Sequence, residues 1–246
     1  FDEGGVKLGL GSSAAVTVCA AASVMYEAGM RIGDAMGQRR LWDVAREVHN
    51  RFQGVRGSGI DIAASVYGGC VRLGDDGDGA GPRISGWALP DGVKPIFLWT
   101  GVAASTTALL AAVNRYESDD RDGHAELFGE LHRVAGGFAD AGSSDHDRAL
   151  GAFREYGDLM AELGRRAKAP VVSGVMTKVM QAAVDAGGAA KPSGAGGGDF
   201  MVALIPDDGD AAGFLERCRI LGLRRYAFNE DVCGVRVAGQ GELGNG

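Results

Sequence analysis

The sequence lacks the cationic surplus that marks proteins with nucleic-acid or anionic-membrane partners. Its 25 Lys and Arg stand against 32 Asp and Glu, for a formal net charge of −7. No basic stripe is visible along the chain. Because polyanionic partners are held by clustered cations that release counterions, we expect neither nucleic acid nor a membrane surface as partner.

Cysteine is also scarce, and the four residues are widely spaced: Cys19, Cys70, Cys218 and Cys233. They form no Cys-x-x-Cys pair and have no histidine at metal-site spacing. We therefore expect reduced and mostly buried thiols, as is typical of a cytoplasmic protein.

Long apolar runs are missing too. The longest stretch of low charge, residues 8–26, contains Ser, Thr and several Gly. A membrane span needs about 20 strongly apolar residues, so this stretch predicts a buried helix instead. No targeting segment is recognisable.

Glycine, in contrast, is abundant, at 42 of 246 residues, against a usual share of ~7%. The excess is local: it gathers in "GLGSSAA" (residues 9–15), "GVRGSG" (54–59) and "KPSGAGGGD" (191–199). With 46% apolar residues the chain can build one large or two ordinary cores. Some of the excess glycine is therefore expected to form part of a functional site.

Hydrophobic periodicity and turn signals predict an α+β protein with a domain boundary near Asp91, giving domains 1–91 and 92–246. In the second helix we expect Met36, Leu41, Val44, Ala45 and Val48 on the apolar face. Helices are expected at 12–30, 34–52, 60–66, 105–116, 123–141, 145–167, 172–188 and 208–221. Strands are expected at 68–74, 83–89, 94–101, 223–229 and 232–238. Residues 189–206 are expected to form a loop that runs into a further strand, and residues 75–82 a solvated acidic loop.

The first glycine cluster opens directly into a predicted helix, for which Ser12 is a candidate N-cap. Glycines let the backbone approach a ligand, and the unpaired amides of a first helical turn attract phosphate oxygens. The pattern is neither a P-loop, since no lysine follows, nor a dinucleotide fingerprint. A tight helix-capping turn without a ligand is the alternative.

For the other two clusters, too, a ligand-binding loop and a purely structural turn are the alternatives. Three consecutive glycines at 196–198 are costly to order, which favours close approach to a ligand over a purely structural turn. Asp61 follows the Gly-Ser-Gly turn in a short predicted helix, where a carboxylate is either a capping group or a catalytic one.

The three features in this order resemble the GHMP kinase superfamily. "GLGSSAA" is similar to its second motif, the phosphate loop, and "KPSGAGGGDFMVAL" to its third. "QGVRGSGIDIAASVYGG" resembles the segment that carries the catalytic aspartate in mevalonate and phosphomevalonate kinases. The resemblance is nearest to phosphomevalonate kinases, through His49, Gln53, the "WTG…AST" turn and Asp199, and runs from Lys7 to about Val237.

The resemblance implies a two-domain fold, with part of a ribosomal-S5-like N-terminal domain and a ferredoxin-like α+β C-terminal domain. It implies ATP-dependent, Mg²⁺-assisted phosphorylation of a phosphorylated small molecule, phosphomevalonate. Asp61 would be catalytic. The nucleotide phosphates would bind to Gly9, Leu10, Gly11, Ser12, Ser13 and Ala14, with Ser12 or Ser13 as metal ligand. Candidates for gripping the acceptor are Ser58, Gly59, Ser105, Thr106, Lys191, Gly194, Ala195, Gly196 and Gly197.

Several assignments stay open at this point. Glu47, Asn50 and Gln53 compete for a second metal-ligand role, and Arg56 could meet an anionic substrate. Lys191 is about equally well explained as a surface lysine. Another GHMP kinase acting on mevalonate or a sugar, and a non-catalytic GHMP-fold binding protein, are the alternative functions.

One expected part has no counterpart in this sequence. The superfamily's first motif, with its Pro-Gly-Lys-like segment, lies upstream of the second motif. We expect it to lie outside this chain, either removed or carried by another chain, in which case the chain alone could be inert until complemented.

Overall fold

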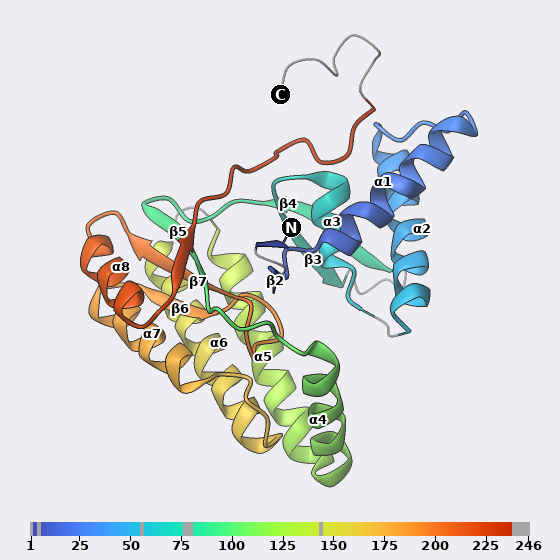
Figure 1. Ribbon diagram of the computed structural model, residues 1–246. Coiled ribbons are helices and arrows are strands. Elements are labelled where there is room, and N and C mark those ends of the chain that lie inside the picture. The colour runs from blue at the N-terminus through green and yellow to red at the C-terminus, as the bar shows by residue number, and fades with distance from the viewer. Residues whose placement is uncertain (1, 4–5, 55–56, 76–80, 143–144, 238–246) are drawn as a thin grey trace. The chain divides into compact units, whose positions relative to one another are not determined.

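The computed structural model describes residues 2–3, 6–54, 57–75, 81–142 and 145–237 (Figure 1). Its contacts divide the chain into two compact units, which are described separately. The N-terminal unit comprises Leu10–Trp87 and the residues from Asn229 onward. The C-terminal unit comprises Ala88–Phe228 and the residues up to Gly9. The units therefore differ at both ends of the chain from the expected domains 1–91 and 92–246.

The N-terminal unit packs three helices and one hairpin. The helices are α1 (Ser12–Glu27), α2 (Ala35–Gln53) and α3 (Ile60–Tyr67), and the strands are β3 (Cys70–Asp75) and β4 (Pro82–Trp87). The two strands pair antiparallel from Cys70↔Trp87 to Asp75↔Pro82. All five elements agree in type with the sequence-based prediction. Most of the expected acidic loop, residues 76–80, lies outside the described residues.

The predicted apolar face of α2 is partly wrong. Leu41 and Ala45 are fully buried, but Met36 is 83% exposed, Val48 50% exposed and Val44 41% exposed. The buried stripe instead includes Trp42 and His49. Trp42 is held there because its Nε1 donates to the Gly59 carbonyl at 3.0 Å.

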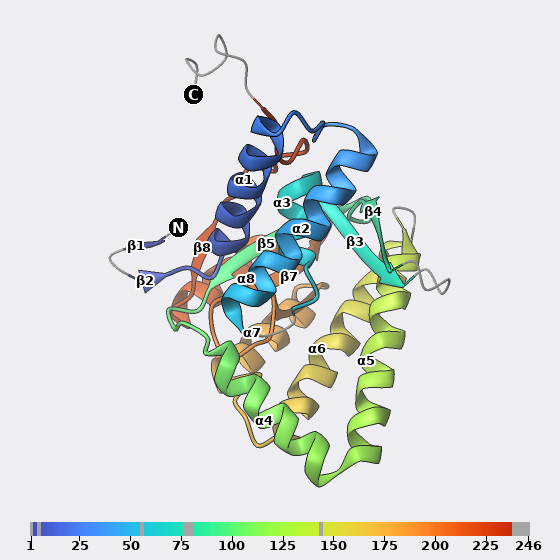
Figure 2. The ribbon, with the colours of Figure 1, turned by 90° about the vertical axis from the view of Figure 1, so that its right-hand side faces the viewer.

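The C-terminal unit is built on a four-stranded antiparallel sheet of order β6-β7-β5-β8. Figure 1 labels β5, β6 and β7, and Figure 2 labels β8. Its strands are β5 (Val93–Trp99), β6 (Ala189–Pro192), β7 (Phe200–Pro206) and β8 (Arg224–Tyr226). Sequence reasoning missed the short strand β6. The unit also holds α4 (Thr106–Asp119), α5 (Arg121–Ala141), α6 (His146–Arg166), α7 (Gly174–Asp185) and α8 (Ala211–Ile220). The two-residue strands β1 (Asp2–Glu3) and β2 (Val6–Lys7) pair with each other.

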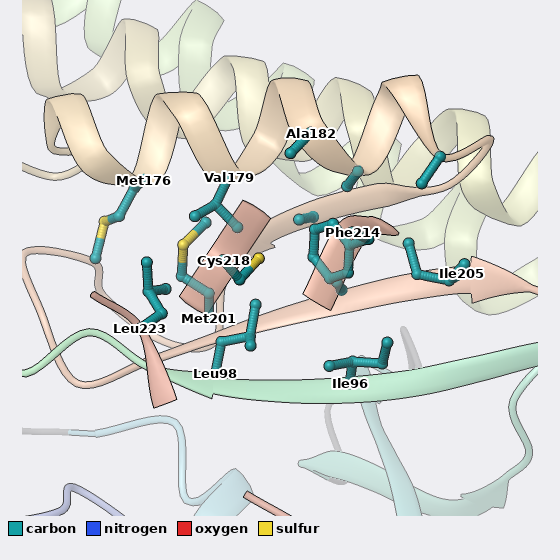
Figure 3. Close-up of a cluster of buried hydrophobic side chains, with 14 residues drawn as sticks. Ile96, Leu98, Met176, Val179, Ala182, Met201, Ile205, Phe214, Cys218 and Leu223 are labelled. Atoms are coloured by element: carbon teal, nitrogen blue, oxygen red, sulfur yellow. The ribbon is translucent and has the colours of Figure 1, made fainter. Parts of the chain in front are cut away.

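Strand β7 is buried on both faces because its residues alternate between two clusters. Met201 and Ile205 join a cluster with Val179 of α7 and Phe214 of α8 (Figure 3). Leu204, which points the other way, packs with α6 residues in a second cluster. The sheet is therefore covered by α7 and α8 on one face and by α6 on the other.

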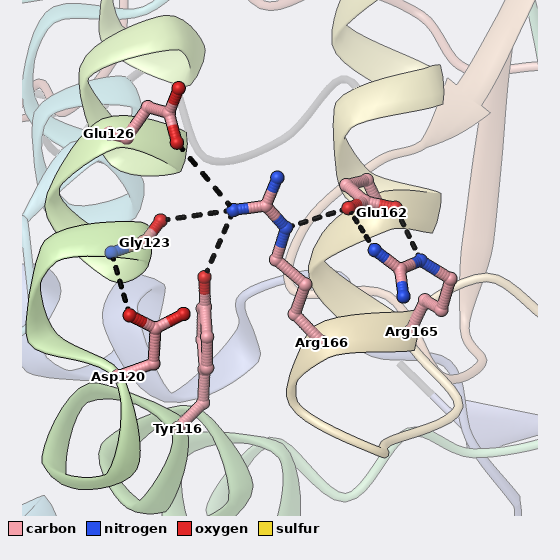
Figure 4. A network of polar contacts seen from close by, with 7 residues as sticks. All are labelled: Tyr116, Asp120, Gly123, Glu126, Glu162, Arg165 and Arg166. Carbon is pink, nitrogen blue, oxygen red and sulfur yellow. Dashed lines mark hydrogen bonds and ion pairs between the residues drawn. The ribbon is translucent and has the colours of Figure 1, made fainter.

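The ends of α4, α5 and α6 are joined through Arg166 (Figure 4). Its Nε donates to Glu162 at 2.6 Å, and its Nη1 donates to the Tyr116 hydroxyl and the Gly123 carbonyl, each at 3.3 Å. Hydrogen bonds from Arg165 and Arg166 lower the pKa of Glu162 to about 2. One guanidinium thus ties three helices of the C-terminal unit together.

Two further expectations are corrected. Residues 232–237 form no strand; Val235 donates to the Val66 carbonyl at 3.3 Å, and Gly234 packs closely against Gly68. All four cysteines are free thiols, but Cys19 and Cys233 are exposed and only Cys218 is fully buried. Among the described residues, no helix combines the length and apolar character that a membrane crossing needs.

Candidate active site

The phosphate-loop candidate begins with two left-handed glycines. Gly9 has φ +70° and Gly11 φ +73°, backbone conformations that favour glycine. Gly11, not the expected Ser12, is the N-cap of α1, and no side chain caps the helix. Since a first helical turn leaves amides without intrahelical partners, those of α1 are available to bind an anion.

Ser13 is held by a buried histidine of the neighbouring helix. Its Oγ lies 3.0 Å from His49 Nε2, and the Gln53 Nε2 amide lies 3.0 Å from the same ring nitrogen. His49 is only 6% exposed. A ring protonated on Nδ1 accepts from both partners, which leaves the lone pairs of Ser13 Oγ free to face a cation.

An open, mostly apolar groove of about 650 Å³ starts at Ser12 and Ser13 and runs between α1 and α2. Its walls include Val16, Val24 and Phe52, which are 68%, 70% and 84% exposed. An apolar surface therefore adjoins the phosphate-loop candidate within the N-terminal unit.

Asp61 lies in the first turn of α3, where the helix dipole favours a negative charge. The N-cap of α3 is Gly59, so Asp61 is not the capping residue. One carboxylate oxygen accepts from the Ile62 amide at 2.9 Å. Within the described residues the carboxylate has no ion-pair partner, and it is half-buried rather than enclosed. The side chain is thus available for a ligand.

Two residues just before Asp61 differ in whether the local structure explains them. Gly59 has φ +81°, and a Cβ there would lie 2.7 Å from Arg46 Cδ. Ser58 is exposed, and its Oγ accepts weakly from the Ile60 amide at 3.4 Å. Ser58 therefore remains accessible to an acceptor, whereas the conformation of Gly59 is explained by packing. Arg56 lies outside the described residues.

The three candidates for a second metal ligand all have protein partners. Glu47 is paired with Arg51 at 2.7 Å on the exposed side of α2. Asn50 Oδ1 accepts from the Gly57 amide at 2.9 Å, and Gln53 contacts His49. The described contacts favour none of them as a metal ligand.

In the C-terminal unit, the third glycine cluster is held by close backbone packing. A Cβ at Gly196 would lie 2.2 Å from the Val171 carbonyl oxygen, and one at Gly198 would lie 2.5 Å from the Val102 carbonyl oxygen. Gly197 donates to the Val171 carbonyl at 2.8 Å. These glycines are thus required by the loop itself, whether or not a ligand binds.

Gly194 and Ala195 differ from the glycines that follow them. Both are exposed, and a Cβ at Gly194 would meet no atom within 4 Å. Ser105 is the N-cap of α4, with its Oγ accepting from the Ala108 amide at 3.4 Å, and the exposed Thr106 begins the helix. These four residues leave surface for an acceptor in the C-terminal unit.

The ammonium group of Lys191 has its contacts inside the C-terminal unit. Its Nζ donates to the Pro192 carbonyl at 3.0 Å and lies 5.0 Å and 5.2 Å from the ring centroids of Phe153 and Tyr156. Burial lowers the pKa of the Lys191 ammonium to about 8. It is therefore no ordinary surface lysine, and its contact with a substrate stays a prediction.

Each unit thus brings together part of the predicted site. The N-terminal unit joins Ser13 to His49 and carries Asp61, and the C-terminal unit joins the third glycine cluster to the start of α4. Sequence reasoning named His49 and Gln53 as family hallmarks but missed the contact of His49 with Ser13. The i, i+4 spacing of His49 and Gln53 signals only their contact with each other.

The comparisons with known proteins agree with this arrangement. Residues 5–69 match the family described as "GHMP kinases N terminal domain", and residues 148–222 match "GHMP kinases C terminal". Together the two matches cover more than half of the chain, in the order expected of that family. The chain belongs to the GHMP kinase family.

Two similar curated proteins are phosphomevalonate kinases. One, from Streptomyces sp. (strain CL190), is 30% identical over 224 residues, which cover 82% of this chain and 58% of the relative. The other, phosphomevalonate kinase erg8 of Aspergillus fumigatus, is 24% identical over 83% of this chain and 51% of its own length. The chain thus spans between one half and three fifths of these relatives.

Solved structures share the fold. The Lin0012 protein of Listeria innocua superposes with a TM-score of 0.82 at 23% identity, over 94% of this chain and 69% of that one. Streptococcus pneumoniae phosphomevalonate kinase, in complex with phosphomevalonate and AMPPNP, gives a TM-score of 0.77 at 18% identity, over 94% and 71%. At these identities the likeness establishes the architecture.

Proposed function

We propose that the chain acts as an ATP-dependent phosphomevalonate kinase, which transfers the γ-phosphoryl group to phosphomevalonate. The observation that carries this proposal is the uncapped start of α1, preceded by two left-handed glycines and adjoined by the Ser13–His49 contact. The acceptor is proposed from the 30% identical relative named phosphomevalonate kinase.

The first-turn amides of α1 bind the nucleotide phosphates in this proposal. They combine unpaired N–H groups with the positive end of the helix dipole, which suits a polyanion. Gly9 and Gly11 allow the chain to turn closely around the phosphates. Ala14 is fully buried, so it anchors the turn to the core of the N-terminal unit.

The residues present fit a magnesium ion. Mg²⁺ prefers hard oxygen ligands and keeps several waters, so one hydroxyl and the phosphates suffice. Ser13 Oγ has lone pairs free when it donates to His49. Ser12, half-buried at the first position of α1, is the alternative ligand. When bound, the ion neutralises charge on the transferring phosphoryl group.

Asp61 acts on the acceptor. The attacking oxygen of phosphomevalonate belongs to a phosphate that is already ionised near neutral pH. Asp61 therefore orients the acceptor and tunes the local charge more than it removes a proton. Ser58, exposed in the same unit as Asp61, supplies a further contact for the acceptor.

The test is an ADP-release assay with Mg-ATP and, in separate reactions, phosphomevalonate, mevalonate and galactose. It is run on this chain and, in parallel, on the product of the complete reading frame that encodes it. We expect turnover with phosphomevalonate alone. Turnover with mevalonate or galactose instead would change the assigned acceptor but support the assignment as a kinase.

Nucleotide binding is measured beside turnover by calorimetry with a non-hydrolysable ATP analogue. Binding without turnover on any acceptor would replace the kinase proposal with a nucleotide-binding protein of the same fold. Activity of the complete product beside a silent 246-residue chain would show that the machinery is incomplete in this chain alone.

A further inference from the structure

Asp199 occupies a point where three segments of the C-terminal unit meet. Strands β5 and β7 pair antiparallel with Trp99 opposite Phe200, so the end of β5 runs beside the start of β7. The Thr100 amide donates to the Asp199 carbonyl at 2.9 Å, and the Asp199 amide donates to the Val102 carbonyl at 2.7 Å. Asp199 thus joins the third glycine cluster to the segment that leads into α4.

The carboxylate of Asp199 extends the same junction. Its Oδ1 accepts from the Ala104 amide at 3.2 Å. On another side it lies against Gly9, the first glycine of the phosphate loop, where an added Cβ would be 2.6 Å from both Cγ and Oδ2 of Asp199. The carboxylate therefore contacts the start of the phosphate loop and fixes the approach to Ser105.

The backbone of Asp199 is held in an unfavourable conformation. Its φ is +52°, and among the described non-glycine residues only Lys168 shares a positive φ. Glycine adopts this region without steric cost, and three glycines directly precede Asp199. Aspartate and asparagine tolerate it better than other side chains. The φ of Asp199 is therefore easier to explain if its side chain has a role of its own.

We propose that Asp199 is a positioning residue for phosphoryl transfer. It holds the segment Thr100–Ser105 and the backbone at Gly9 against the third glycine cluster through its hydrogen bond and its shape, without touching the reacting atoms. The proposal rests on the proposed kinase function for its effect on turnover, but its structural part concerns contacts within one unit.

Three substitutions separate the effects of the charge, the acceptor oxygen and the left-handed backbone of Asp199. Asp199→Asn keeps the acceptor oxygen and tolerates the left-handed backbone, but removes the charge. Asp199→Gly relieves the backbone and removes the acceptor. Lys168→Gly is the matched control, because it relieves the same φ of 52° at an exposed residue away from these contacts.

Two readouts are measured on the complete active protein. Hydrogen exchange of the peptide that contains the Ala104 amide reports the loop directly, and kcat/KM reports its consequence. We expect Asp199→Gly to speed exchange at least about tenfold and to lower kcat/KM by about 10- to 100-fold. Asp199→Asn is expected to stay within a few-fold of wild type on both, as is Lys168→Gly. Thermal unfolding confirms that each variant is folded.

Two outcomes would overturn the proposal. Wild-type exchange and turnover in Asp199→Gly would show that the side chain positions nothing. A loss of turnover in Asp199→Asn as large as in Asp199→Gly, with exchange unchanged, would show that the charge acts on the ligands themselves. If wild type turned over no acceptor, the kinase function would fail, and the exchange of the Ala104 amide would still decide the positioning role.

Discussion

Ser13 Oγ and His49 Nε2 lie 3.0 Å apart, and this contact joins the first turn of α1 to the buried face of α2. Gln53, one turn after His49, approaches the same nitrogen at 3.0 Å. A serine hydroxyl at a phosphate loop is free to rotate unless a partner fixes it. The buried imidazole provides that partner, and when Ser13 donates to it the lone pairs of Ser13 Oγ stay free for a ligand.

His49→Phe keeps an aromatic ring of similar size but leaves the Ser13 hydroxyl without its partner. Loss of a residue that orients a metal ligand typically weakens affinity by about 10- to 100-fold. We expect a loss of this order in the affinity for a Mg-bound ATP analogue, measured by calorimetry. Ser23→Ala is the control, since this exposed serine on α1 donates only to the Cys19 carbonyl. Unchanged affinity in His49→Phe would refute the orienting role.

Asp61→Asn tests the proposed catalytic role of this carboxylate with little change in shape. Its oxygen can still accept from the Ile62 amide, so α3 should remain folded. Because the charge that orients the acceptor is lost, we expect kcat to fall by about 100-fold or more in the ADP-release assay. Asp43→Asn, an exposed carboxylate on α2 paired with Arg39, serves as control. Near-normal turnover in Asp61→Asn would remove the assignment.

Gly196 and Gly194 separate glycines needed by the fold from glycines needed by a ligand. Gly196→Ala would place a Cβ 2.2 Å from the Val171 carbonyl oxygen at φ +85°, so we expect it to destabilise the protein by more than about 2 kcal/mol. Gly194→Ala meets no atom within 4 Å and should leave the unfolding midpoint unchanged.

Thermal unfolding of the two variants gives the comparison. A loss of turnover in Gly194→Ala at unchanged stability would support close approach of a ligand to that residue. Equal stability losses in both variants would contradict the packing argument.

Much of the fold was predictable because it depends on local signals. Asp34, Ser173 and Asp210 each cap a helix near its expected start. Helix α7 ends at Asp185 with Ala186 as its C-cap, and left-handed Gly187 follows, close to the expected end of the helix at residue 188. The face of α2 was less predictable, because Val44 and Val48 extend an apolar stripe that the core does not use. Periodicity identifies a helix, but it does not say which of two overlapping stripes the neighbours cover.

The candidate site was also predictable only in part. The glycine clusters and Asp61 are visible in the sequence, since glycines at a turn before a helix have a local physical meaning. The contacts Ser13–His49 and Asp199–Ala104 span 36 and 95 residues. The first depends on how α1 packs against α2, and the second on the register of β5 with β7. Neither packing nor register is a local property of the chain.

Lys191 predicts a distinctive pH dependence of stability. Its ammonium is desolvated between Phe153 and Tyr156, and the pKa falls from 10.5 to about 8. Below pH 8 the lysine is protonated in both states, and folding carries the full cost of the buried charge. Between pH 8 and 10.5 the unfolded chain binds more protons, so stability rises with pH. The shift corresponds to at most about 3 kcal/mol.

Lys191→Met removes this titration while retaining an unbranched apolar stem. We expect the free energy of unfolding of the wild type to rise relative to Lys191→Met as the pH increases from 8 to 10, measured by urea titration at each pH. Lys178→Met, an exposed lysine on α7, should show no such relative change. A constant difference between wild type and Lys191→Met would mean that water or a counter-ion solvates the ammonium. Lys191 would then be free to meet a substrate phosphate with its full charge.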